Sequence, residues 1–208
     1  MGSLKLGTLT VRVSAHARPA RGEARCGDVA GSWTEGDALW FALLDAAGHG
    51  DDAATAAERG LALLRTPGAA SPVHRLGAHQ GASLGRPVAV ALGRLGSEAP
   101  EVELALVGNI RLQFLSGPSA PSTHEGQPGM WAGHFPRLRP LRLTLQPGQR
   151  VLLHSDGLAG AARLDALPAG MSPRPLLVAL DERWGRPHDD LSCLLLDIFD
   201  GNRWPFAD

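Results

Sequence analysis

The chain has 208 residues, and its 20 basic and 21 acidic side chains leave a formal net charge of −1, which gives no electrostatic reason to bind nucleic acid or an anionic membrane. Hydrophobic residues make up 44% of the sequence and charged residues 20%, proportions typical of a globular protein with a substantial core. Two cysteines, Cys26 and Cys193, are too few for a disulfide framework or a cysteine-based zinc site.

The N-terminus lacks the long apolar segment of a signal peptide, and no stretch approaches the ~18 apolar residues of a membrane span. The composition does not break anywhere along the chain, so we expect a single domain over residues 1–200, followed by a short C-terminal tail at 201–208. We expect a cytoplasmic protein without a nucleic-acid or membrane partner. A monomer is the expected state, although the sequence carries no signal for or against oligomers.

The first third of the chain predicts strands followed by a helix. Apolar residues alternate weakly over 4–13, which predicts an edge strand, and the Arg-rich segment 14–26 predicts a loop. Residues 28–34 and 37–45 flank a Glu-Gly turn and predict a hairpin. The second of these strands is apolar on both faces, so we expect it inside its sheet. Acidic residues and alanines then predict a helix over 51–65.

The rest of the chain continues this mixture of strands and helices. A Ser-Pro start predicts a helix at 71–80, and residues 173–184 predict another. A segment rich in Pro, Gly, Ser and His, 117–137, is expected to be a surface loop. Further strands are predicted at 87–95, 101–107, 110–115, 141–145, 149–155 and 190–199. Runs of strands joined by short turns, with helices between them, predict an α+β fold with antiparallel sheets.

Aspartates stand at the ends of several apolar runs. Asp45 and Asp156 each close such a run, Asp189 and Asp190 precede one, and Asp28 precedes a shorter one. A carboxylate at the end of a buried strand is costly unless a cation meets it. Several of them gathered at one edge of the fold would form an oxygen-rich site suited to Mg²⁺ or Mn²⁺. Taken one at a time, each motif has a plain explanation as a cap, a turn or a solvated acid.

A glycine-rich loop, Ala46-Ala47-Gly48-His49-Gly50, follows Asp45 directly. Its glycines allow backbone carbonyls to approach an ion closely, and the helix after it would point its amide end at an anion such as phosphate.

The order of these motifs resembles the PPM (type 2C) metal-dependent protein phosphatase superfamily. The segments that carry the resemblance are an apolar strand ending in Asp45 with its glycine loop and helix, then Ser155-Asp156-Gly157, then Asp189-Asp190-Leu191-Ser192. The SpoIIE/RsbU/RsbX branch is the most similar, and a short chain without a sensor domain is most like the stand-alone stressosome phosphatases of the RsbX type. Further segments similar to that branch are Cys26-Gly27-Asp28, 83–87, 107–111 and 127–133.

The resemblance implies an αββα sandwich of two mainly antiparallel sheets flanked by helices, with two Mn²⁺ or Mg²⁺ ions at the loop ends. Asp45 would bridge both metals and the nucleophilic water, and the Ala46 backbone carbonyl would be a further ligand. Asp28 would bind one ion, while Asp156 and Asp189 would bind the other.

Three roles stay open. Asp190 would either support a neighbouring ligand or bind a weaker third ion. His49 is a possible general acid, but it lies four residues after Asp45, whereas the eukaryotic type 2C enzymes place a histidine directly after an Asp-Gly pair. The phosphate-binding arginine of those enzymes has no clear counterpart, and Arg21 and Arg25 are the candidates.

The implied activity is hydrolysis of phosphoserine or phosphothreonine on a bacterial regulatory protein by a water activated between two metals. By resemblance, the partner would be a phosphorylated STAS-domain stressosome protein or an anti-sigma-factor antagonist. One alternative is a catalytically silent PPM-fold domain that binds a partner protein, and another is a metal-dependent hydrolase of small phosphate esters.

Overall fold

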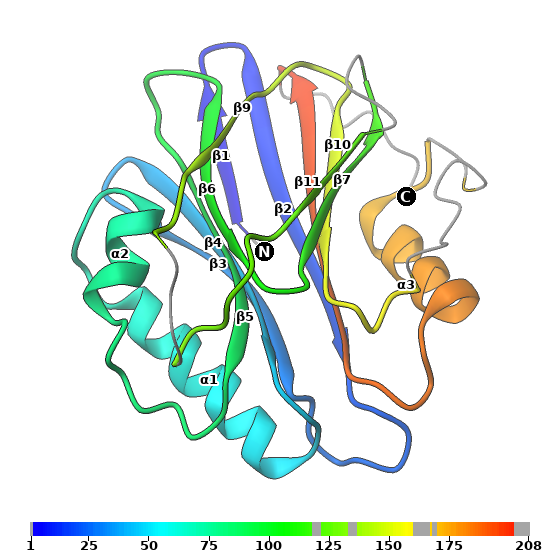
Figure 1. The fold of residues 1–208 in the computed structure, drawn as a ribbon. Coiled ribbons are helices and arrows are strands. Elements are labelled where there is room, and N and C mark those ends of the chain that lie inside the picture. The colour runs from blue at the N-terminus through cyan, green and yellow to red at the C-terminus, as the bar shows by residue number, and fades with distance from the viewer. Residues whose placement is uncertain (1, 118–121, 133–136, 160–166, 168–169, 202–208) are drawn as a thin grey trace.

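Two β-sheets lie face to face, and helices cover their outer faces (Figure 1). This computed structural model describes residues 2–117, 122–132, 137–159, 167 and 170–201. The layers form the αββα sandwich that the resemblance implies, and the strand pairs within the described residues are antiparallel. None of the helices in this part of the chain is long and apolar enough to cross a membrane.

The six-stranded sheet has the order β1-β2-β11-β10-β7-β8, and the five-stranded sheet has the order β3-β4-β5-β6-β9. The strands of the first sheet are β1 (Gly2–Leu6), β2 (Leu9–Arg18), β7 (Arg111–Ser116), β8 (Ser122–Glu125), β10 (Arg150–His154) and β11 (Leu191–Asp200). Those of the second are β3 (Asp28–Glu35), β4 (Ala38–Ala46), β5 (Val88–Leu95), β6 (Glu101–Val107) and β9 (Leu141–Thr144).

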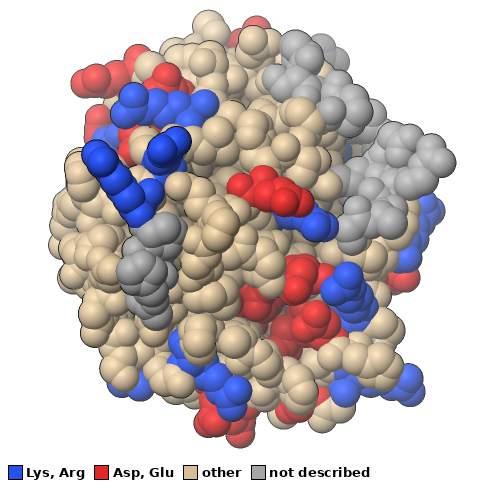
Figure 2. Space-filling view, in the orientation of Figure 1, with Lys and Arg blue, Asp and Glu red and all other residues tan. Residues whose placement is uncertain are grey.

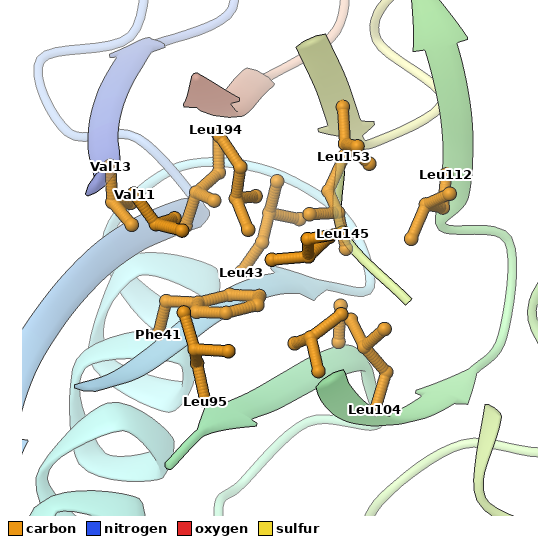
Figure 3. Close-up of a cluster of buried hydrophobic side chains, with 14 of the residues drawn as sticks. Val11, Val13, Phe41, Leu43, Leu95, Leu104, Leu112, Leu145, Leu153 and Leu194 are labelled. Carbon is orange, nitrogen blue, oxygen red and sulfur yellow. The ribbon is translucent and has the colours of Figure 1, made fainter. Parts of the chain in front are cut away.

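Three hydrophobic layers hold the sandwich together. The largest lies between the sheets, where Phe41 and Leu43 of β4 pack in the same cluster as Leu153 and Leu194 of the opposite sheet (Figure 3). A second layer lies under α1 (Asp51–Arg65) and α2 (Pro72–Ala78), and a third lies under α3 (Pro173–Trp184). Burial of this apolar surface is the main force that stabilises the arrangement.

Strand β4 is apolar throughout because both of its faces are buried. Its odd-numbered residues Leu39, Phe41 and Leu43 face the layer between the sheets, whereas Trp40 and Leu44 face the helical layer. Side chains alternate between the two faces of a strand, so a strand buried on both sides has no polar positions to offer. The predicted hairpin of β3 and β4, the interior position of β4 and the predicted helix over 51–65 are confirmed.

Two predictions near the N-terminus are wrong. Residues 4–13 do not form one strand, because the chain turns at Gly7, whose φ of 59° is left-handed, and returns as β2. The loop predicted over 14–26 begins only after Arg18, since β2 pairs with β11 as far as that residue. This part of β2 is rich in polar residues, so it was predicted as a loop, but pairing with β11 makes it a strand.

The loop predicted over 117–137 also contains a strand. Residues 122–125 form β8, which pairs with β7 at the edge of the six-stranded sheet. Its sequence, Ser-Thr-His-Glu, has no apolar alternation, because an edge strand with exposed faces does not need any. Residues 118–121 and 133–136 of this segment, and 202–208 of the predicted tail, lie outside the described residues.

A buried arginine fastens α2 to the five-stranded sheet. Arg75 is 1% exposed, and its guanidinium lies 3.8 Å from the ring centroid of Trp40. It donates to both carboxylate oxygens of Glu35 at 2.8 Å and to the carbonyls of Ala69 and Leu64 at 3.1 Å. These hydrogen bonds lower the pKa of the Glu35 carboxyl. One side chain therefore joins both helices of this layer to the β3–β4 hairpin.

We expect Arg75→Met to lower the free energy of unfolding by roughly 3 kcal/mol, because it leaves Glu35 and two carbonyls without their donor. Urea denaturation measures the change. The control is Arg65→Met, since Arg65 is exposed and its guanidinium lies 5.7 Å from the ring centroid of Trp33, an interaction worth about 1 kcal/mol or less. Equal losses in the two variants would contradict the anchoring role of Arg75.

Candidate metal centre

The ends of four strands bring the predicted aspartates to one edge of the sandwich. Asp28 begins β3 and lies directly opposite Asp45, near the end of β4. In the other sheet, His154 at the end of β10 pairs with Cys193 near the start of β11. Asp156 follows β10 and Asp189 precedes β11, so both lie at the same edge of this sheet. Figure 2 shows a cluster of acidic side chains in the lower centre of one face, over the loop ends of the two sheets.

Asp45 shows most clearly that the carboxylates lie together. Burial, together with the negative charges of Asp28, Asp156 and Asp189, raises the pKa of its carboxyl to about 8. A hydrogen bond from the Asn109 side chain acts in the opposite direction. The Oδ2 atom of Asp45 is buried and has no hydrogen-bond partner among the described residues. This carboxylate therefore has an oxygen that the protein itself does not satisfy.

Asp28 is the most deeply placed of the four, with 4% of its surface exposed. Burial raises the pKa of its carboxyl to about 7, although hydrogen bonds from Ser155 and Ser192 favour the charged form. The Ser192 hydroxyl donates to Oδ2 of Asp28 at 2.9 Å, and the amide of Ser192 donates to the Ser155 hydroxyl at 3.0 Å. Ser192 of β11 and Ser155, which follows β10, thus orient a carboxylate of the five-stranded sheet.

Asp189 and Asp156 complete the group and are partly exposed. Burial raises the pKa of the Asp189 carboxyl, and the negative charge of Asp156 raises it further, while the positive charge of Arg186 lowers it. The aspartates predicted to bind metal thus come together from four separate segments.

The donor set fits a hard divalent cation. Carboxylate oxygens are the preferred ligands of Mg²⁺ and Mn²⁺, and a cation would relieve both the repulsion among the carboxylates and the unsatisfied Oδ2 of Asp45. Over the part of the chain that the structure describes, however, no group of three or more His, Cys, Asp or Glu side chains is close enough to hold an ion without rearrangement. Ala46, whose carbonyl was predicted as a ligand, is the last residue of β4 and lies opposite Val88.

Asp190 uses both of its carboxylate oxygens on the backbone. Oδ1 accepts a hydrogen bond from the amide of Ala20 at 2.8 Å, and Oδ2 accepts one from the amide of Gly27 at 2.9 Å. Gly27 precedes Asp28, so Asp190 connects the loop that carries Asp28 to the loop that carries Asp189. Gly157 packs against the Asp190 carbonyl, where any Cβ would collide, which explains the glycine after Asp156.

The other candidates form contacts with residues outside the group of aspartates. His49 is exposed, and its Nδ1 is hydrogen-bonded to Glu23 at 2.6 Å. Arg25 donates to Glu58 at 2.8 Å on the surface of α1. Arg21 is exposed, and its amide donates to the carbonyl of Pro187. No side-chain contact of these residues with the four aspartates is found among the described residues.

Several residues that support the site had no predicted role. Arg18, at the end of β2, donates to Asp181 at 2.8 Å, to the Asp189 carbonyl at 2.7 Å and to the Arg186 carbonyl at 2.9 Å. It therefore holds both ends of the turn before β11. Ser155 and Ser192 stand inside the motifs, but their contact with Asp28 joins segments that are distant in sequence. Short-range spacing gave no signal for these contacts.

We expect Asp190→Asn to lower the free energy of unfolding by about 1–3 kcal/mol, because an amide N–H would face one of the two backbone N–H donors. Chemical denaturation of the metal-free protein measures this loss. Asp200→Asn is the matched control, since Asp200 is exposed at the end of β11 and should change stability by less than about 0.5 kcal/mol. If Asp190→Asn leaves the free energy of unfolding unchanged, the two backbone contacts contribute nothing to stability.

The metal-free protein should lose stability as the pH rises from 3.8 toward about 8. In this window folded Asp28 and Asp45 retain protons that the unfolded chain has released, so ionisation favours unfolding. Urea midpoints measured in chelator across the window should fall with pH, and Asp45→Asn should flatten the slope. An unchanged slope in that variant would argue against a raised pKa at Asp45.

No protein-family model and no curated protein matches the sequence, but solved structures match the fold. A structure from work on the bacterial stressosome, described as a modular system adapted to control secondary messenger signalling, is 26% identical, with 89% of this chain and 98% of that one covered and a TM-score of 0.74. RsbX in complex with magnesium is 18% identical, with 95% and 98% covered and a TM-score of 0.75.

The catalytic domain of the serine/threonine phosphatase PstP, in complex with two manganese ions, is 15% identical, with 93% of this chain and 100% of that one covered and a TM-score of 0.61. These likenesses extend over most of the chain and agree with the two antiparallel sheets and three helices described above. The chain therefore has the fold of the PPM phosphatases, and it matches their RsbX branch at the level of the fold.

Proposed function

We propose that this protein is a metal-dependent serine/threonine protein phosphatase. The observation that carries the proposal is the gathering of Asp28, Asp45, Asp156 and Asp189 at the loop ends of a PPM-phosphatase fold, with a buried and unsatisfied oxygen on Asp45. A protein maintains such a costly group of like charges when a cation is to be bound there.

In this proposal Asp45 and the Ala46 carbonyl would be ligands of Mn²⁺ or Mg²⁺. Asp28 would hold one ion, and Asp156 and Asp189 would hold the other. The ions, when bound, neutralise the phosphoryl oxygens and make a water molecule more acidic. The hydrogen bond from Ser192 fixes the orientation of Asp28, and Asp190 fixes the loop that carries it. Asp190 acts through these backbone contacts, so we assign it support of Asp28.

The reaction joins a water oxygen to phosphorus and breaks the bond between phosphorus and the seryl or threonyl oxygen. The attacking water gives up a proton, the leaving oxygen takes up a proton in its place, and inorganic phosphate is released. Such a transfer depends mainly on positioning and on neutralisation of charge, which carboxylate-held cations supply without a protein nucleophile. Burial raises the pKa of the Cys26 thiol to about 12, so this neighbour of the site is a poor nucleophile.

The substrate we propose is a phosphorylated STAS-domain stressosome protein or an anti-sigma-factor antagonist in the cytoplasm. Support comes from two similar structures, one from work on the stressosome and the other RsbX itself. A catalytically silent domain that binds such a partner is the second candidate. It is favoured by the absence, among the described residues, of three metal-binding side chains already drawn together.

The two candidates differ in what Mn²⁺ does. We expect the wild-type protein to bind Mn²⁺ by calorimetry and to hydrolyse a phosphoserine peptide in its presence. Asp45→Asn should lower kcat/KM by more than roughly 100-fold, because it alters a direct ligand. Asp200→Asn removes the same charge from an exposed site and should retain full activity. A protein that binds no Mn²⁺ and releases no phosphate would support the silent domain.

A further inference from the structure

Arg186 has a backbone that is fixed on three sides next to two of the aspartates. Its amide donates to the carbonyl of Gly157 at 2.8 Å, and Gly157 follows Asp156 directly. Its carbonyl accepts from the amide of Asp189 at 3.2 Å and from the guanidinium of Arg18 at 2.9 Å. The residue is thus attached to the segments of both Asp156 and Asp189.

The side chain of Arg186, in contrast to its backbone, is not held by hydrogen bonds to the described residues. It is exposed, and its guanidinium makes no hydrogen bond or ion pair with any residue that the structure describes. Its positive charge reaches the carboxylates, since it lowers the pKa of Asp189. Arginine carries five donors in a planar fork that matches the oxygens of a phosphate. Arg186 therefore brings an uncommitted anion-binding group to the rim of the acidic cluster.

Three other arginines around the site, Arg18, Arg25 and Arg86, are already engaged. Arg18 is bound to Asp181 and to backbone carbonyls, as described above. Arg25 donates to Glu58, and Arg86, beside the glycine loop after Asp45, donates to Asp52 at 3.1 Å. A cation already paired with a carboxylate must give up that partner before it can bind a substrate. This cost does not apply to Arg186.

We propose that Arg186 binds the phosphoryl group of the substrate and so performs the role for which Arg21 and Arg25 were the sequence candidates. The inference rests on the proposed phosphatase function. The fixed backbone sets the position of the side chain, while the exposed guanidinium donates to phosphoryl oxygens beside the metal-binding carboxylates. Charge on these oxygens must be balanced throughout phosphoryl transfer, so a bidentate donor there assists both binding and reaction.

The test compares three variants in the full-length protein. Arg186→Gln should lower kcat/KM for a phosphoserine peptide by roughly 10- to 100-fold, the loss expected for a charged hydrogen bond. It should also weaken binding of inorganic phosphate to the Mn²⁺-loaded protein, measured by calorimetry. Arg186→Lys retains the positive charge without the planar guanidinium, so its kcat/KM and its phosphate affinity should lie between those of the wild type and those of Arg186→Gln. Arg183→Gln, which removes an exposed arginine from the last turn of α3, should leave both quantities unchanged.

Binding of Mn²⁺ separates this inference from the proposed function. Arg186→Gln should bind Mn²⁺ as the wild type does, because its side chain is assigned to the substrate. If the variant retains wild-type kcat/KM and phosphate affinity, or if it loses Mn²⁺ affinity instead, the inference is overturned. If the wild type binds phosphate through Arg186 but hydrolyses no phosphopeptide, the phosphatase function fails while the assignment of Arg186 stands.

Discussion

The repulsion between Asp28 and Asp45 is the constraint on which the rest of this structure depends. The two carboxylates face each other across neighbouring antiparallel strands, where like charges are unfavourable, and burial adds to the cost. Asp156 and Asp189 approach from the other sheet and increase the repulsion. The three apolar layers supply the stability that holds this edge of the sandwich together.

The polar contacts around the aspartates share one property: each joins segments that are far apart in sequence. Ser192 orients Asp28 from the opposite sheet, and Asp190 binds the backbone of the Asp28 loop. Arg18 holds the turn before β11 through backbone carbonyls. Contacts of this kind fix the positions of carboxylates that would otherwise move apart.

Elements with strong local patterns were predicted well from the sequence, and elements held by their neighbours were not. Strand β4 alternates between two apolar layers, and α1 begins with acidic residues and continues with alanines, so both were predicted with nearly correct bounds. Strand β8 and the second half of β2 are polar and depend on pairing with β7 and β11. Pairing energy comes from hydrogen bonds to a partner that no local pattern reveals.

The sequence by itself determined which carboxylates are available, that Asp45 follows an apolar strand, and that glycines come after it. These are local properties, and burial of apolar strands forces polar groups to their ends. Only the tertiary structure decided that Asp190 binds backbone amides and that His49 is hydrogen-bonded to Glu23. It also decided that Arg186 acts on Asp189 while its side chain has no hydrogen-bond or ion-pair partner among the described residues. The partner of a side chain depends on which distant segments meet when the two sheets close on each other, and spacing along the chain contains no information about that meeting.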